Sequence, residues 1–412
     1  VAGSAYTFTY TTVGEIVAWV VGWDLILEML MAGSVVSKYW GVYLNQFFEL
    51  IGWNINTNIA IGSFNFDLAP VIIVAFFTAL LVMGTKIGAR VDGALTILKI
   101  AIVVLIVVVG FFYIKAENFT PFIPPSEPAA STDGSGVSAV MEQPLWQWAT
   151  GMAPSIYGVT GIISGAALVF FAFLGFDVVA TASEETINPK KNVPLGIGVG
   201  LGLIIVLYTL VAIVTTGMVS YKDLAKQSDP SLAVAFKMVG ADWAAKIISL
   251  GIVIGMATVV MVLLLGLTRV VFAMSRDGLL PRGLSHTGKH GTPVRLQIIV
   301  GVVMALIAAC CNVGILSDMV NIGTLSAFTL VAISIPIMRK KRPDLERSFK
   351  IPGNPWVPIL IALANLWLMV NLSVLTWIRF VVWLIVGFAI YFGYGYRHAR
   401  LGAGELEVAA QE

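Results

Sequence analysis

The feature that most constrains this chain is a succession of apolar runs, each long enough to cross the hydrocarbon core of a bilayer. The runs lie at about 13–36, 68–87, 93–114, 158–183, 194–218, 243–275, 295–312, 316–338, 356–374 and 378–397. Charged residues make up only 12% of the chain, roughly half the share of a soluble domain. Only helices and closed barrels satisfy the backbone within lipid, and runs of this length are helical. The sequence therefore predicts an all-α, polytopic membrane protein with about ten transmembrane helices.

The connecting segments predict the orientation of the chain. The longest are 37–67 and 115–157, and Lys and Arg gather on one set of alternate connectors, above all in RKKRPDLERSFK at 339–350. Cytoplasmic connectors carry such an excess, so this block needs no nucleic-acid partner to explain it. We therefore expect residues 1–400 to form one transmembrane domain in the cell membrane. The polar connector 1–12 and a tail at 401–412 are expected in the cytoplasm.

Few residues could support metal, redox or hydrolytic chemistry. Cys310 and Cys311 are adjacent in an apolar run, and vicinal cysteines rarely pair. His286 and His290 lie in a polar connector without neighbouring metal ligands. We therefore expect no metal, no cofactor and no catalytic residue. The competing classes are an intramembrane enzyme, which would need a nucleophile with its base, and a channel or structural subunit.

Charged residues within or beside the predicted spans are candidates for function, because each costs about 2.5–3.5 kcal/mol to insert. They are Asp24, Glu28, Lys99, Asp177 and Arg269. Asp24 and Glu28 share one helix face because they are four residues apart. Asp24 and Arg269 also fit structural pairs, Arg269 fits snorkelling towards phosphates, and Glu28 fits a site or a pair. Lys99 lies too deep to snorkel, so its ammonium must find an oxygen partner or lose its proton.

A break in one apolar run indicates a binding site. The run GVTGIISGAALVFFAFLGFDVV places Gly175 between bulky residues, directly before Phe176 and Asp177. Glycine lowers helix preference by about 1 kcal/mol, and a break at membrane depth is tolerated where the freed backbone groups line a cavity. Beyond it, SEETINPKKNVP returns the chain to the cytoplasm. There we expect Glu184 and Glu185 to serve as an interfacial anchor and inner gate, with Asp177 as a gate or structural charge.

Three stretches resemble the cationic amino acid transporter branch of the amino acid–polyamine–organocation superfamily. They are AGSAYTFTYTTVGEIVAWVVGWDLILEML, FFAFLGFDVVATASEETINPKKNVP and TRVVFAMSRDGLLP. The resemblance, which runs from Val1 to about Arg400, implies a twelve-helix bundle whose first ten helices form two inverted five-helix repeats. Helices one and six of such a bundle are broken at mid-membrane around the substrate. On that pattern this chain supplies helices three to twelve, and we expect the first two helices to be absent from it.

The resemblance also implies roles for single residues. The carbonyl groups of Phe171, Ala172 and Leu174, beside Gly175, are expected to accept hydrogen bonds from the substrate amino group. Phe176 is expected to close over the bound substrate.

Three further positions match residues elsewhere in the family's bundle. Lys99 matches a lysine whose ammonium takes the place of a sodium ion in related sodium-coupled carriers. Glu28 matches an acidic position near the side-chain end of the substrate. Met256 matches a position that shapes the side-chain pocket, although an ordinary core methionine is the alternative.

Together these features predict a secondary active transporter that moves cationic or small neutral amino acids without sodium and coupled to protons. Glu28 favours a cationic side chain, although a neutral amino acid can also lie beside it. An amino acid/polyamine exchanger of the same superfamily is the alternative. The expected partners are an amino acid, protons and the lipid bilayer, and the expected state is a monomer or weak oligomer.

Overall fold

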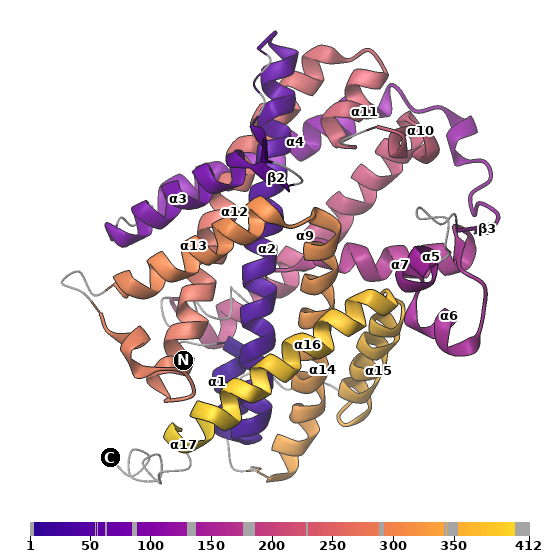
Figure 1. Ribbon diagram of the computed structural model, residues 1–412. Coiled ribbons are helices and arrows are strands. Elements are labelled where there is room, and N and C mark those ends of the chain that lie inside the picture. The colour runs from indigo at the N-terminus through magenta and orange to yellow at the C-terminus, as the bar shows by residue number, and fades with distance from the viewer. Residues whose placement is uncertain are drawn as a thin grey trace.

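The structure is a computed structural model dominated by long helices (Figure 1). It describes residues 4–53, 55, 57–61, 64–84, 89–129, 137–175, 186–227, 230–287, 292–341, 343 and 353–399.

Each predicted apolar run overlaps an apolar helix in the part of the chain that the structure describes. Six helices are long and apolar enough to cross a membrane, and four apolar helices are shorter. In chain order they are α2 (Glu15–Leu50), α3 (Leu68–Val82), α4 (Ala89–Phe111), α7 (Gly158–Val169), α9 (Pro189–Met218), α12 (Asp242–Arg276), α13 (Val294–Cys310), α14 (Val313–Lys341), α15 (Trp356–Val370) and α16 (Val374–Ile390). Large apolar side chains remain exposed along α9, α15 and α16, as expected of helices that face lipid. The prediction of an all-α polytopic membrane protein is confirmed.

The start of the chain differs from the prediction. Residues 4–12, predicted as part of a polar connector, form the helix α1 (Ser4–Thr12). Tyr6 and Tyr10 of α1 are buried in the same core cluster as α2 and α12 residues. The hydroxyl of Thr9 donates to the carbonyl groups of Ala5 and Tyr6, which satisfies it within the helix. Tertiary packing therefore stabilises a helix that hydropathy alone does not reveal.

The predicted connector 37–67 is also partly helical, because α2 continues to Leu50. Its second half packs against neighbouring elements: Gly41 lies against Ala69 of α3, and the buried hydroxyl of Tyr43 accepts from the backbone N–H of Leu232. Hydropathy measures the length embedded in lipid, whereas a helix held by such contacts continues beyond it. After α2 the chain forms an antiparallel hairpin of β1 (Asn58–Ile61) and β2 (Phe64–Asp67).

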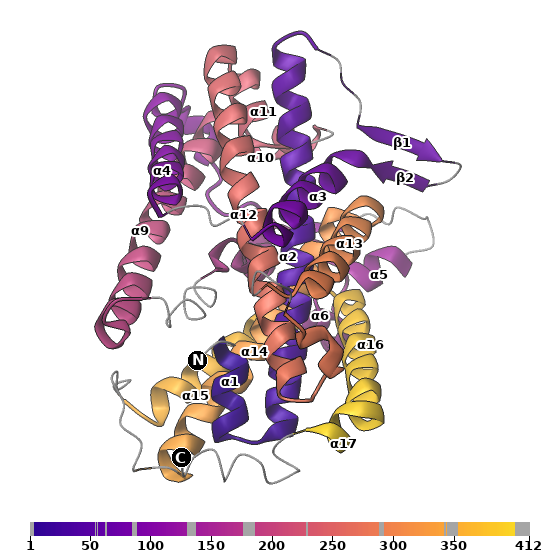
Figure 2. The same cartoon turned by 90° about the vertical axis from the view of Figure 1, so that its left-hand side faces the viewer.

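The remaining connectors carry short elements. They are η1 (Ala116–Phe119), β3 (Glu127–Pro128), α5 (Val137–Glu142), α6 (Leu145–Thr150), β4 (Ser155–Ile156), α10 (Tyr221–Ala225), α11 (Leu232–Met238) and η4 (Arg282–Ser285). The α16 segment continues through η5 (Tyr391–Gly395) into α17 (Tyr396–His398). In both ribbon views α1 and α17 lie at the same end of the molecule (Figures 1 and 2).

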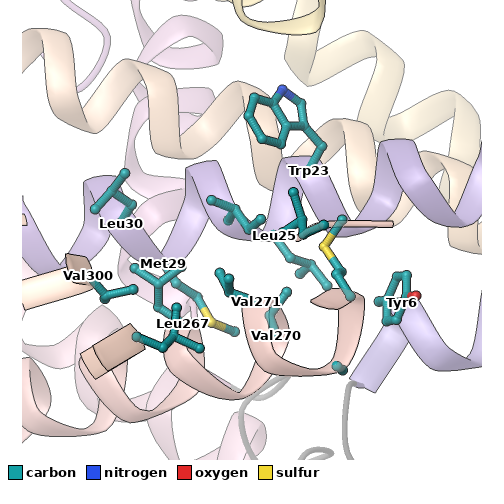
Figure 3. Packing of buried hydrophobic residues seen from close by; sticks show 14 of the residues in the cluster. Tyr6, Trp23, Leu25, Met29, Leu30, Leu267, Val270, Val271 and Val300 are labelled. Atoms are coloured by element: carbon teal, nitrogen blue, oxygen red, sulfur yellow. The ribbon is translucent and has the colours of Figure 1, made fainter. Parts of the chain in front are cut away.

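Two helix pairs repeat along the chain. A helix of 36 residues, α2, precedes α3 of 15 residues, and α12 of 35 residues precedes α13 of 17 residues. The long helices pack on each other, and so do the short ones. The α2–α12 pair is antiparallel: Gly22 lies against Met274, whereas Gly33 lies near Leu263. Figure 3 shows Leu25 and Met29 of α2 facing Leu267, Val270 and Val271 of α12.

Candidate functional site

Regular helical structure ends just before Gly175. After α7 the chain tightens into the 3₁₀ turn η2 (Phe170–Phe173), and Leu174 is extended. Gly175 has φ of 123°, a conformation that residues with a side chain rarely adopt. A methyl group added there would meet nothing within 4 Å, so backbone conformation rather than space requires glycine. Several backbone groups at 170–175 are therefore released from α-helical hydrogen bonding.

Two polar side chains from other helices donate hydrogen bonds to backbone carbonyl groups near this end of α7. The hydroxyl of Tyr208 on α9 donates to the carbonyl oxygen of Ala172 at 2.9 Å, and its ring lies 5.3 Å from that of Phe173. The buried amide of Asn321 on α14 donates to the carbonyl oxygen of Leu168 at 2.9 Å. Sequence reasoning missed both residues. Each is a polar side chain inside an apolar run, which is a sequence signal for a functional residue. Neither carries a formal charge, so the search for charged residues within the spans did not select them.

The side chains of the break point towards three long helices. Phe171 and Leu174 pack against a cluster formed by Ala32 of α2, Leu263 of α12 and Val320 of α14. Phe170 adds an edge contact to Phe328 of α14 at 6.2 Å. The predicted residues Phe171, Ala172, Leu174 and Gly175 therefore lie beside an apolar surface that is built from α2, α12 and α14.

The two acidic residues of α2 lie within the bundle. Glu28 is 2% exposed and one helical turn from Ala32, which belongs to the cluster at the break. Asp24 is fully buried another turn away, where Ser326 of α14 faces it. The two helices approach closely here, since an added methyl at Gly323 of α14 would lie 3.5 Å from the Asp24 carbonyl oxygen. Glu28 is thus the acidic residue nearer the break.

Lys99 bridges α4 and α12. Its ammonium donates to the buried hydroxyl of Thr258 at 2.7 Å, and its aliphatic stem lies against Gly255. Leu263, which packs at the break, lies five residues beyond Thr258 on α12, a distance of about 7.5 Å along the helix axis. Met256 follows Gly255 but packs with Tyr43, Ala233 and Val253, so its side chain contributes to a different cluster.

The remaining predicted site residues are Arg269 and four residues that follow the break in the sequence. Arg269 lies on α12, half-buried, three turns beyond Thr258. Phe176, Asp177, Glu184 and Glu185 lie outside the described residues. Within the described ranges, no group of three or more His, Cys, Asp or Glu side chains could hold a metal ion.

The segment that follows Arg269 joins the end of α12 to α1. Asp277, next after α12, accepts a 2.9 Å hydrogen bond from the hydroxyl of Tyr6 on α1. Burial, and then the charge of Asp277, raise the pKa of the Tyr6 phenol, which therefore stays protonated and remains a donor. This contact fixes α1 to the end of α12.

Comparison with known proteins gives a consistent result. Residues 1–393 match the profile of the family described as amino acid permease. A branched-chain amino acid permease of Bacillus subtilis is 41% identical over 97% of this chain and 81% of its own length. A methylthioribose transporter of the same organism is 39% identical over the same shares of the two chains. A cationic amino acid transporter of Arabidopsis thaliana is 34% identical over 84% of this chain and 53% of its own.

Proposed function

Because the chain belongs to the amino acid permease family, a family of multi-pass membrane proteins, we propose that it is a secondary transporter for neutral amino acids with apolar side chains, coupled to protons and independent of sodium. The observation that carries this proposal is the interruption at 170–175 beside an apolar surface of three helices. Freed backbone groups bind the charged ends of an amino acid, and the apolar wall accepts its side chain.

The substrate preference rests on two observations. The cluster beside the break consists of Ala32, Leu263 and Val320, with Phe171 and Leu174 packed on it. These side chains favour an aliphatic group over a charged one. The relative with 41% identity is named a branched-chain amino acid permease, which points the same way.

A cationic substrate is the second candidate, and buried Glu28 favours it. A carboxylate that is 2% exposed and one turn from Ala32 can pair with a guanidinium or ammonium group. A relative named as a cationic amino acid transporter is consistent with this alternative.

Coupling to protons is proposed from Lys99. A fixed ammonium between α4 and α12 supplies one positive charge inside the bundle, which removes the need for a sodium ion at that point. We further propose that the protein acts in the plasma membrane with both ends of the described chain in the cytoplasm. The basic last turn of α14, with Arg339, Lys340 and Lys341, supports this orientation.

Uptake by the complete protein, purified and reconstituted in proteoliposomes, tests the proposal. We expect accumulation of labelled leucine that increases with an inward proton gradient and is unchanged when choline replaces sodium. Unlabelled leucine and alanine should compete, whereas arginine and methylthioribose should not. Competition by arginine would support the second candidate, and absence of uptake for every amino acid tested would overturn both.

A further inference from the structure

A cavity lies away from the break, where the junction of α1 and α2 meets the segment that continues α16. Its volume is about 910 Å³. It is lined by the junction of α1 and α2 (residues 13–17), Arg282 of η4, Tyr391 and residues 396–399. Both ribbon views place α1 and α17 together at this end of the molecule (Figures 1 and 2).

The charged groups of this cavity favour an anion. Arg282 and Arg397 are exposed, and neither guanidinium forms an ion pair or hydrogen bond within the described part of the chain. His398 also lines the cavity, and its Nδ1 lies 2.8 Å from the carbonyl oxygen of Tyr394. The one carboxylate in the lining, Glu15, accepts a 2.8 Å hydrogen bond from the buried hydroxyl of Tyr391. The cavity thus offers two guanidinium groups without a partner among the described residues, and its one carboxylate already accepts a hydrogen bond. This arrangement suits a phosphate, which Arg binds through paired hydrogen bonds.

The rim of the cavity is apolar and aromatic. Ile16 is 51% exposed and Tyr396 is 65% exposed. Phe392, 58% exposed, lies one turn before Tyr396 on the same face. The helix α2 begins at Glu15 and α16 ends at Ile390, so this rim lies where two membrane helices reach the interface. Exposed aromatic side chains at that level contact lipid headgroups and the first carbons of the acyl chains.

The wider charge distribution agrees with a membrane surface at this end. The helix α14 runs towards it, because Val320 packs near Ala32 whereas Val331 joins the cluster that contains Tyr6. The last turn of α14 carries Arg339, Lys340 and Lys341. A leaflet that contains anionic lipid attracts such residues by about 1 kcal/mol each.

We infer that the cavity lined by Glu15, Arg282, Tyr391, Tyr396, Arg397 and His398 binds the phosphate headgroup of an anionic phospholipid. The two guanidinium groups hold the phosphate, and Ile16, Phe392 and Tyr396 contact the acyl chains. The apolar rim favours a lipid over free phosphate, which would use the arginines alone. This inference does not depend on the transported substrate.

Native mass spectrometry of the full 412-residue chain tests the inference. The protein is purified in detergent and titrated with phosphatidylglycerol, phosphatidylcholine or inorganic phosphate. We expect saturable binding of phosphatidylglycerol, about tenfold weaker binding of phosphatidylcholine, and no displacement by millimolar inorganic phosphate. Displacement by inorganic phosphate, or equal binding of the two lipids, would overturn the assignment to an anionic lipid.

A pair of double variants separates the cavity from diffuse attraction. Arg282→Gln with Arg397→Gln removes both guanidinium groups, whereas Lys340→Gln with Lys341→Gln removes two charges from α14 outside the cavity lining. We expect the first variant to bind phosphatidylglycerol at least about tenfold more weakly and the second to bind it like the wild type. Equal loss in the two variants would refute a localised site. The thermal unfolding midpoint of each variant in detergent shows that folding is retained.

Discussion

The ammonium nitrogen of Lys99 on α4 lies 2.7 Å from the hydroxyl oxygen of Thr258 on α12. The Thr258 hydroxyl uses its own hydrogen to donate to the carbonyl oxygen of Gly255, 2.9 Å away. Its lone pairs are therefore available to accept the hydrogen bond from Lys99. The Thr258 hydroxyl therefore connects Lys99 of α4 to the backbone of α12.

Replacing Lys99 with Ala is expected to abolish the stimulation of leucine uptake by an inward proton gradient. The replacement removes the fixed charge between the two helices together with its bond to Thr258. Uptake measured with and without the gradient, in otherwise identical proteoliposomes, provides the ratio that should fall to about one.

A matched control for this variant is Ser249→Ala. Ser249 is a buried hydroxyl on the same helix as Thr258, but it donates to the carbonyl of Ala245 within α12. It should retain the stimulation. If the Lys99→Ala protein still responded to the gradient as the wild type does, Lys99 would have no part in coupling.

Replacing Glu28 with Gln is expected to change leucine uptake little, with a KM within about threefold of the wild type. The reason is that a neutral aliphatic side chain gains nothing from the charge of the carboxylate. The same variant distinguishes the second candidate, because a cationic substrate would lose an ion pair inside the bundle and its uptake would fall by at least about tenfold. Asp24→Asn, one turn away on the same face, controls for the removal of a buried carboxyl group.

Tyr208→Phe is expected to raise the KM for the substrate about fivefold and to change kcat little. The variant keeps the ring that contacts Phe173 and loses the hydroxyl that orients the Ala172 carbonyl. A carbonyl oxygen has two lone pairs, so it can accept from Tyr208 and from a substrate amino group together. Initial uptake rates over a range of leucine concentrations provide both constants. A lowered KM would show instead that the hydroxyl competes with the substrate.

Asn321→Ala is expected to destabilise the protein by about 1–3 kcal/mol, because the Leu168 carbonyl at the end of α7 loses its donor. The thermal unfolding midpoint in detergent should fall accordingly. Thr324→Ala is the comparison, since the buried Thr324 hydroxyl donates only to Val320 within its own helix. Equal stability of the two variants would contradict a role for Asn321 in holding the break.

The helices could be predicted from the sequence because the bilayer imposes a length and a composition on each span. Each of the ten apolar runs overlaps an apolar helix within the described residues. The ends were less predictable, since α2 extends to Leu50 through contacts with α3 and α11 that hydropathy does not measure.

The candidate site was partly predictable for a related reason. Gly175 and Lys99 are conspicuous because glycine and a charge are costly inside an apolar helix. Tyr208 and Asn321 are not conspicuous: their bonds to residues 172 and 168 join positions 36 and 153 residues apart. Such contacts depend on how distant helices pack, which local composition does not encode.

A final prediction concerns the contact between α2 and α16. The indole of Trp23 stacks on Trp383 at 4.3 Å, and its N–H donates to the Trp383 carbonyl at 2.9 Å. A methyl group at Gly387, one turn further along α16, would lie 2.5 Å from Cδ1 of that indole. Because the stacking and the hydrogen bond both fix the ring, it cannot move aside, and Gly387→Ala should destabilise the protein by about 1–3 kcal/mol.

The comparison is Gly393→Ala, where an added methyl meets nothing within 4 Å. This variant should be as stable as the wild type or slightly more so, because Ala favours helix over Gly by about 1 kcal/mol. Thermal unfolding of the two variants in the same detergent should therefore show shifts of opposite sign or clearly different size. A double variant, Gly387→Ala with Trp23→Leu, should lose less stability than the sum of its single changes, since the smaller side chain leaves room for the methyl. Additive losses would mean that Gly387 is required for a reason other than contact with Trp23.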